Sequence, residues 1–243
     1  MEPEVQTTKS VRNLAIPISI VIAGAIIGGA LIIGLRSSGT SPVAATDPGS
    51  QQPTQTADIT KVKIAGEPFI GKQDAPVTIA YWFDYQCPFC QRNEEQTMPQ
   101  IVKDYVNTGK VKVVFKDFQF LGPDSQTLGK YSHAVWETAS DKFYQWHKAV
   151  YDNQGTENTG WATPEKIRSI TQGVLGAADT DKVIALVKSK GDAYQKIMDA
   201  DKAEGGAMGI NGTPGTIIGK QLVEGAQPYS VFKQVIDLTL AGK

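Results

Sequence analysis

The chain contains few residues of the types that ligate transition metals, and it has no excess of charge of either sign. Only two of its 243 residues are histidines, His133 and His147, and only two are cysteines, Cys87 and Cys90. A structural zinc site needs about four ligands at close spacing, and 13 residues separate the two histidines, so we expect no metal site. The 24 basic and 25 acidic residues give a net charge of −1, so we expect no nucleic acid partner.

The scarcity of cysteine also favours an oxidising compartment for this protein. Cys87 and Cys90 form one CxxC pair, CPFC, and the chain has no other thiol. Proteins in oxidising compartments avoid stray thiols, because these can be trapped in wrong disulfides. A static crosslink is the alternative interpretation of the pair, but so short a loop would restrain little chain entropy. The pair therefore favours redox chemistry outside the cytoplasm.

Charged residues are missing from one long segment near the N-terminus. Residues 14–35 are 22 uncharged, mostly apolar residues, and a helix of this length spans the hydrocarbon core of a bilayer, which is about 30 Å thick. We therefore predict a transmembrane signal-anchor. The alternative is a cleaved signal peptide with its cleavage site at Val43-Ala44-Ala45. Such peptides have apolar cores of only about 7 to 15 residues, which favours the uncleaved anchor.

The flanking residues predict how the chain is divided and oriented. Lys9 and Arg12 precede the span, so residues 1–13 should be a short cytoplasmic N-terminus. Residues 36–60 are rich in Ser, Thr, Pro and Gln, which predicts a flexible linker. Residues 61–243 should then form one globular domain on the extracytoplasmic side of the cytoplasmic membrane.

Periodicity in the globular part predicts an α/β fold. The β-branched and aromatic run at 77–83 is typical of a buried strand, and 111–118 predicts a second. Between them, 88–106 predicts a helix with Glu94, Glu95 and Lys103 on its polar face. Strand, helix and strand in this order form a parallel βαβ unit.

The second half of the domain has a different pattern. Helical periodicity dominates from about 126 to 207, which predicts a helical insertion. Short strands at 216–218 and 221–223 flank Gly219-Lys220, a two-residue turn typical of a hairpin, and 229–240 predicts a final amphipathic helix.

The CPFC pair stands where the first helix should begin. A thiolate is the nucleophile in disulfide exchange, and the unpaired N–H groups and dipole of a helix N-terminus favour that anion. We therefore predict that Cys87 is the nucleophile and that Cys90, one turn further on, resolves the mixed disulfide. Pro88 and Phe89 should tune the pair. Because the Phe89 side chain has no donor, we expect a less extreme oxidant than a Pro-His version.

Four separated segments resemble the DsbA-like branch of the thioredoxin superfamily, which carries a helical insertion in a thioredoxin-like fold. They are APVTIAYWFDYQCPFC, VVFKDFQFLGPDSQ, FYQWHKAVYDNQ and GINGTPGTIIG, and the resemblance extends from about Pro68 to the C-terminus. The resemblance implies that Pro214, with a plausible cis peptide bond, faces the cysteines. It also implies that Thr213 offers its backbone to bound peptides.

One position departs from that resemblance. Many relatives carry a buried glutamate six residues before the first cysteine, where it helps to move the proton of the second cysteine, and Tyr81 stands there in this chain. Because Tyr81 is neutral, it should tune the pair by favouring the Cys87 thiolate. Proton transfer at Cys90 would then fall to water or another group, with Asp84 and Lys116 as candidates. His147 is more simply interpreted as a packed histidine than as a catalyst.

The resemblance also implies partners and rival functions. The substrates would be newly exported or unfolded proteins with thiols, and a quinone-linked membrane protein of the DsbB or VKOR kind would reoxidise the pair. No bound cofactor is expected, since the disulfide itself carries the electrons. The alternatives are a disulfide reductase or isomerase, and a peptide-binding or chaperone module in which CPFC is passive.

Overall fold

The computed structural model describes residues 55–242. The predicted cytoplasmic N-terminus (1–13), the predicted anchor (14–35) and most of the predicted linker lie outside the described residues. Within 55–242 no helix is both long and apolar enough to cross a membrane. The elements are β1 (Gln55–Thr56), η1 (Ile59–Lys61), β2 (Phe69–Ile70), β3 (Val77–Phe83), α2 (Pro88–Gln96), α3 (Met98–Ile101), η2 (Val102–Val106), β4 (Val111–Asp117), α4 (Pro123–Thr138), η3 (Ser140–Lys142), α5 (Phe143–Asp152), α6 (Pro164–Leu175), α7 (Ala177–Ala207), β5 (Gly215–Ile218), β6 (Gln221–Glu224) and α8 (Tyr229–Leu240).

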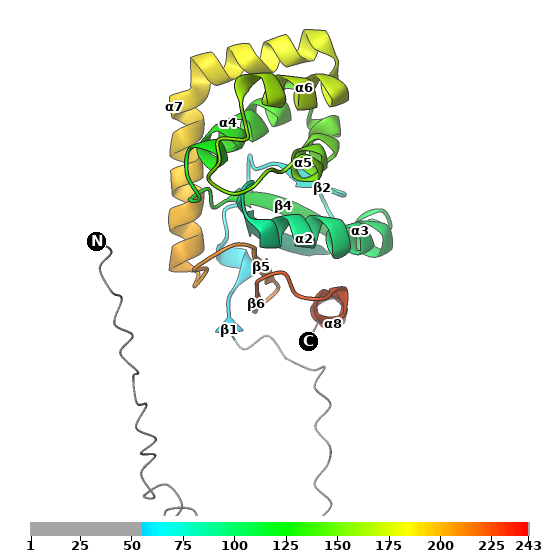
Figure 1. Cartoon of the computed structure of the whole chain (residues 1–243). Coiled ribbons are helices and arrows are strands. Elements are labelled where there is room, and N and C mark those ends of the chain that lie inside the picture. The colour runs from blue at the N-terminus through cyan, green and yellow to red at the C-terminus, as the bar shows by residue number, and fades with distance from the viewer. Residues whose placement is uncertain (1–54, 243) are drawn as a thin grey trace, which may run out of the picture. The chain divides into compact units, whose positions relative to one another are not determined.

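A six-stranded sheet with the order β1-β6-β5-β3-β4-β2 forms the centre of the domain (Figure 1). β3 and β4 pair in parallel, with Tyr81 opposite Phe115, as the βαβ pattern predicts. β5 pairs antiparallel with both β3 and β6. The predicted turn at Gly219-Lys220 closes the β5–β6 hairpin, and Gly219 adopts a φ of 58°, which glycine tolerates without strain.

The folded domain begins earlier than the sequence pattern predicts. Gln55 and Thr56 pair with β6, and the amides of Ala57 and Ile59 donate to the carbonyls of Lys220 and Gly219. The predicted boundary at residue 61 is therefore wrong, because 55–60 already belongs to the sheet edge. Backbone pairing with β6 holds this polar segment, which no hydrophobic pattern could reveal. The strand β2 is apolar, but with only two residues it is too short for a periodic pattern to predict.

The helix predicted for 88–106 is interrupted. α2 ends at Gln96, α3 contains Pro99, and Val102–Val106 forms a wider π-turn. A π-turn shifts the helical periodicity, which explains the irregular apolar spacing of this segment. The polar-face prediction is wrong for Glu94, which is buried, and right for Glu95 and Lys103, which are exposed.

Alternation along β3 divides the interior into two cores. Ile79, Tyr81 and Phe83 face the larger core, which is filled from α2, α3, α5, α6 and α8. Ala80 and Trp82 face a smaller core on the other side of the sheet. Successive residues of a strand point to opposite faces, so each site residue on β3 or β4 can be assigned to one core.

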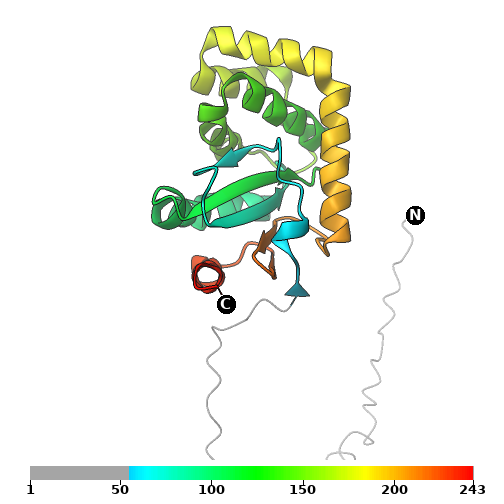
Figure 2. The ribbon, with the colours of Figure 1, turned by 180° about the vertical axis from the view of Figure 1, so that it is seen from behind.

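The helical insertion extends from Pro123 to Ala207 and covers one end of the sheet (Figure 1). Its last helix, α7, turns beside the other helices of the insertion and then runs beside the sheet in both views (Figure 2). The contact with the sheet is close. Trp82 Nε1 donates to the Asp201 carbonyl at 3.0 Å, and a Cβ on Gly205 would lie only 2.8 Å from that nitrogen.

Candidate active site

Cys87 is the N-cap residue of α2, and Pro88 fills the first helical position, where no amide hydrogen bond is lost. Both cysteines are free thiols in this structure. The pKa of Cys87 is lowered to about 6, first because the Cys90 thiol donates to its sulfur. Burial opposes this effect, while Thr213 and the amides of Cys90 and Phe89 strengthen it. Cys87 therefore ionises near neutral pH, as its helical position predicts.

Cys90 has the opposite properties. Its side chain is fully buried, and burial raises its pKa well above the ordinary value. Donation to the Cys87 sulfur and the negative charge on that sulfur raise it further, because both favour the protonated form. Cys87 thus loses its proton easily, whereas Cys90 remains a thiol.

The loop before β5 lies against the cysteine pair. The Thr213–Pro214 peptide bond is cis, and the Cys87 Sγ lies 3.3 Å from the Thr213 carbonyl oxygen, to which its thiol donates. Thr213 Oγ1 is buried and has no hydrogen-bond partner within residues 55–242. The structure therefore brings Thr213 and Pro214 together with Cys87, although Thr213 lies 126 positions after Cys87 in the chain.

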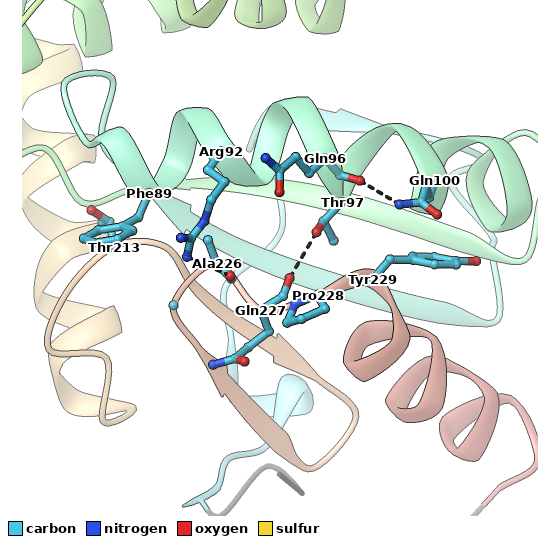
Figure 3. A pocket seen from close by; sticks show the side chains of 11 residues that line it. Phe89, Arg92, Gln96, Thr97, Gln100, Thr213, Ala226, Gln227, Pro228 and Tyr229 are labelled. Atoms are coloured by element: carbon cyan, nitrogen blue, oxygen red, sulfur yellow. Dashed lines mark hydrogen bonds between the residues drawn. The ribbon is translucent and has the colours of Figure 1, made fainter. Parts of the chain in front are cut away.

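A groove of about 710 Å³ leads away from the cysteines between α2 and the segment that joins β6 to α8 (Figure 3). Phe89 and Thr213 lie at one end, and Tyr229 lies at the other (Figure 3). The Phe89 ring is 55% exposed, and the Arg92 guanidinium lies 5.1 Å from its centroid. Arg92 also donates to the Ala226 carbonyl at 3.1 Å, so its side chain reaches from α2 to the opposite wall of the groove (Figure 3).

The insertion fixes the loop that carries the cysteines. Gln154 Nε2 donates to the carbonyls of Tyr85 and Cys87 at 2.8 and 3.2 Å. Tyr151 Oη donates to the Asp84 carbonyl at 3.0 Å. Sequence reasoning did not identify either contact. Gln154 and Tyr151 both belong to FYQWHKAVYDNQ, one of the four segments of the resemblance. Membership of that segment is the one feature of the sequence that could have marked them as part of the site.

Neither proton-transfer candidate predicted from the sequence faces Cys90. The Asp84 carboxylate already accepts from the amides of Gln86, Phe120 and Leu121 and from the Ser125 hydroxyl. It is the Asp84 amide that favours the Cys90 thiolate. Lys116 pairs in register with Trp82, so it points into the smaller core, on the other face of the sheet.

Tyr81 does lie on the Cys90 side of the sheet. It is fully buried, and its pKa is raised well above the ordinary value, first by burial and then by the charges of Cys90 and Glu94. His147 is also buried, with its centroid 4.8 Å from that of Phe83 and 4.7 Å from that of Phe115. His147 is therefore packed among aromatic rings, as the sequence predicts, yet its Nε2 lies 3.4 Å from Glu94 Oε1.

The sheet, the CxxC pair at a helix N-terminus and the cis proline opposite it define a thioredoxin-type dithiol protein. A family model described as thioredoxin matches residues 63–238, and the chain belongs to this family.

Similar curated proteins and solved structures support the assignment to this family. The chain is 29% identical over 185 residues to disulfide bond formation protein D of Bacillus subtilis, covering 74% of this chain and 80% of that protein. The oxidised crystal structure of BdbD from the same species matches with a TM-score of 0.68 and 25% identity, over 79% of this chain and 100% of that chain. Wolbachia pipientis alpha-DsbA2, a thiol-disulfide exchange protein, shares the fold at 24% identity, with a TM-score of 0.62 over 72% of this chain and 88% of that chain. The chain is thus a DsbA-like thiol-disulfide oxidoreductase.

Proposed function

We propose that this enzyme oxidises thiols of newly exported proteins, with Cys87 as its nucleophile and Cys90 as its resolving cysteine. The observation that supports the proposal is the asymmetry of the pair. The pKa of Cys87 is lowered to about 6, while that of the buried Cys90 is raised. Only Cys87 is then an anion near neutral pH, and it is the better leaving group in exchange.

The reaction balances with the protein's own sulfurs. A substrate thiolate attacks Cys87 Sγ, the Cys87–Cys90 bond breaks, and its electron pair leaves on Cys90 Sγ. A second substrate thiolate then attacks the substrate sulfur of the mixed disulfide, and Cys87 leaves as a thiolate. The substrate gains one disulfide and the enzyme becomes a dithiol, so no bound cofactor is required.

Whether the enzyme oxidises or reduces its substrates depends on whether the fold stabilises its dithiol or its disulfide form. The pKa of Cys87 is lower in the folded protein than its reference value of 9.0. This stabilisation of the reduced enzyme is fully present above about pH 9 and is lost as the pH falls through about 6. A stabilised reduced form makes the disulfide a stronger oxidant, which favours oxidation over reduction of substrates.

The groove and the loop at Thr213 and Pro214 supply the proposed binding site for substrate. Backbone contacts at a strand-like segment ignore sequence, which suits many unfolded substrates. Pro88 and Phe89 border this site, and Phe89 offers an exposed ring beside the sulfurs. Broad specificity is then part of the proposed function.

The proposed setting is the outer side of the cytoplasmic membrane, with residues 14–35 as the anchor. The single CxxC pair and the absence of other thiols from the sequence support an oxidising compartment. Repeated turnover requires a reoxidant, and we propose a quinone-linked membrane protein of the DsbB or VKOR kind. Anchoring would keep both partners in the same membrane.

Equilibration of the full-length chain with glutathione buffers tests the direction. An oxidase should have a reduction potential well above the value of about −270 mV typical of thioredoxin, and closer to the approximately −120 mV of a strong oxidant. We expect an intermediate value, because Phe89 supplies no side-chain donor to Cys87. A potential at or below about −270 mV would support the reductase alternative instead.

A further inference from the structure

The lining of the groove beside the cysteines has one charged side chain. Eleven residues of the described chain line the groove, and Arg92 is the one among them that is ionised at neutral pH. The other polar side chains are glutamine amides and the hydroxyls of threonine and tyrosine. Tyr229 stays neutral, because desolvation raises its pKa above the ordinary value. The lining thus carries a positive charge and no negative one.

Neutral groups hold Arg92 in place. Its guanidinium lies 5.1 Å from the centroid of the Phe89 ring and donates to the Ala226 carbonyl at 3.1 Å, and it points from α2 into the groove (Figure 3). Within residues 55–242 no carboxylate lies at ion-pair distance from it. A guanidinium has five N–H donors, and the Ala226 carbonyl uses one. The other donors of this exposed side chain face water or a ligand.

The place of Arg92 along the groove corresponds to one position in a bound peptide. Phe89 and Thr213 lie at the end of the groove beside Cys87, and Arg92 follows Phe89 by three residues, or about 4.5 Å along α2. An extended peptide advances about 3.3 Å per residue, and its side chains alternate between two faces. A side chain two residues from the substrate cysteine therefore lies about 7 Å away on the same face, within reach of the long Arg92 side chain.

The neighbouring carboxylates lie outside this part of the groove. Glu95 is exposed on α2 but does not line the groove. Asp104 accepts from Tyr229 Oη at 2.5 Å, at the end away from the cysteines (Figure 3). Glu224 lines a separate cavity of about 290 Å³. The charge that a substrate side chain meets near the cysteine pair is therefore that of Arg92.

We propose that Arg92 makes this enzyme selective for substrates with a carboxylate two residues from the cysteine that attacks Cys87, and that it disfavours lysine or arginine there. The inference rests on the proposed function, since it names the substrate class of the same groove. A carboxylate accepts two parallel hydrogen bonds from a planar guanidinium. Phe89 and the Ala226 carbonyl already fix the guanidinium, so substrate binding costs little side-chain freedom. A cationic side chain would meet a like charge instead.

The test uses single-cysteine peptides and the full-length chain with Cys90→Ser, in which a mixed disulfide on Cys87 persists. Asp, Asn or Lys stands two residues before or two residues after the peptide cysteine. The peptide thiolate attacks Cys87 Sγ of the glutathione mixed disulfide, and glutathione leaves as a thiolate that takes up a proton. Mass spectrometry gives the equilibrium constant of each exchange. The ratio of the Asp constant to the Lys constant measures the charge preference at each position.

Arg92→Gln removes the charge from the groove, and Arg168→Gln is the matched control. Arg168 is exposed on α6, pairs with Asp181 and does not line the groove. An exposed ion pair changes an equilibrium constant by up to about fivefold, and a like charge acts in the opposite direction. We therefore expect the Asp-to-Lys ratio to fall about tenfold in R92Q at one of the two positions and to stay unchanged in R168Q. Arg92→Lys, which keeps the charge without the planar fork, should retain part of the preference.

The distance of the charge separates a binding site from the general field of the protein. An Asp or Lys six residues from the peptide cysteine lies about 20 Å away in an extended chain, beyond the Debye length of about 10 Å at 0.1 M salt. Its ratio should therefore not depend on Arg92. Equal ratios in R92Q and R168Q at both near positions would overturn the proposal. So would a loss in R92Q that is as large for the distant residue as for the near one.

A measurement with Arg92 intact covers the case in which R92Q does not fold. The same peptides are exchanged with bis(2-hydroxyethyl) disulfide, a neutral small disulfide, which gives the intrinsic effect of each charge on the peptide thiol. The Asp-to-Lys ratio on the enzyme should exceed this reference at one near position. The excess should shrink at about 1 M salt, where the Debye length is about 3 Å. A ratio equal to the reference at both positions would overturn the proposal.

The same experiments distinguish this inference from the proposed function. Loss of the charge preference, with every peptide still forming a mixed disulfide on Cys87, would leave the proposed function intact. Failure of all peptides to displace glutathione from Cys87 would contradict the proposed function and the inference with it.

Discussion

Two buried polar clusters lie on opposite faces of the same sheet, and they differ in how well their members are paired. The ion cluster, in and beside the smaller core, consists of Glu67, Lys116, Asp201 and Glu204. Lys116 Nζ contacts all three carboxylates: Glu67 at 3.0 Å, Glu204 at 3.2 Å, and Asp201 in a closer contact. The cysteine cluster, in the larger core, consists of Tyr81, Cys90, Asn93, Glu94 and His147. Several of its polar atoms have no hydrogen-bond partner among the described residues.

The difference indicates what each cluster does. Buried charges that are paired with an opposite charge fix the packing of neighbouring elements, and here Lys116 joins β4 to α7 and to the segment after η1 through its contacts with all three carboxylates. Buried polar groups that are left partly unpaired are costly, and such groups concentrate where chemistry requires them. The cysteine cluster includes Cys90, whereas the ion cluster lies on the other face of the sheet. We therefore assign stability to the ion cluster, and we expect changes in the cysteine cluster to alter the chemistry of the dithiol.

The largest effect should come from the nucleophile. Cys87→Ser replaces a thiolate by a hydroxyl that stays protonated at neutral pH, so we expect dithiol peptide oxidation to fall at least about a thousandfold. Cys90→Ser is the matched control. Its Cys87 thiolate should still attack the disulfide of an oxidised peptide, release one peptide thiol and keep the other half as a mixed disulfide, which mass spectrometry detects. It should not turn over in dithiol peptide oxidation, because it has no disulfide of its own to transfer. Unchanged turnover by C87S would contradict the role of Cys87.

Breaking the ion cluster should cost stability without changing the chemistry. Lys116→Met leaves three carboxylates close together without their cation, and removal of one partner of a buried pair costs about 3–5 kcal/mol. Urea unfolding measures this loss. Alkylation of Cys87 should keep its pH midpoint near 6 in the variant. A displaced midpoint would show that the two clusters are coupled through the sheet.

The loop before β5 should have a smaller effect, which is on the pKa of Cys87. Thr213→Val keeps the shape of the side chain and removes its hydroxyl, which has no partner while Cys87 is a thiol and can donate to the Cys87 thiolate, an interaction that lowers the pKa of Cys87. Hydrogen bonds to charged groups contribute about 1.5–3 kcal/mol, so the pKa of Cys87 should rise by about one to two units. Thr213→Ser, which retains the hydroxyl, should leave the pKa unchanged. Equal titrations of T213V and T213S would exclude the side chain as a donor.

The smallest predicted effect concerns Phe89. Phe89→His adds a group that can carry positive charge beside the sulfurs, so the pKa of Cys87 should fall by a few tenths of a unit. The reduction potential should become more oxidising in parallel. Phe89→Leu, which adds no charge, serves as the control in the same glutathione equilibration. A potential that moves equally in F89H and F89L would point to loss of the Arg92–Phe89 contact instead.

The sequence predicts the elements whose local patterns are strong. The β-branched run of β3, the two-residue hairpin turn and the amphipathic α8 all appear where expected. β1 could not be predicted, because backbone pairing with β6 alone holds this polar segment. The burial of Glu94 could not be predicted either. A helical pattern marks charged residues as exposed, and only the packing of α5 onto α2 reverses that assignment.

The site was predictable in part for similar reasons. The spacing of CPFC and its place before a helix reveal Cys87 and Cys90, since helix N-termini favour thiolates. Thr213 and Pro214 came from the resemblance alone, because no local rule joins residues so distant in the chain. Gln154, whose side chain holds the cysteine loop, was missed because its donor role depends on the tertiary position of the residues after α5.

The titration of Cys87 in the reduced full-length chain tests the central claim most directly. Thiolate absorbance at 240 nm and the rate of alkylation by iodoacetamide, both followed against pH, report the ionisation of the pair. We predict that one thiolate forms with a midpoint near pH 6, while Cys90 stays protonated beyond pH 9. A first thiolate that appears only near pH 8.5, as for an ordinary cysteine, would contradict an activated Cys87.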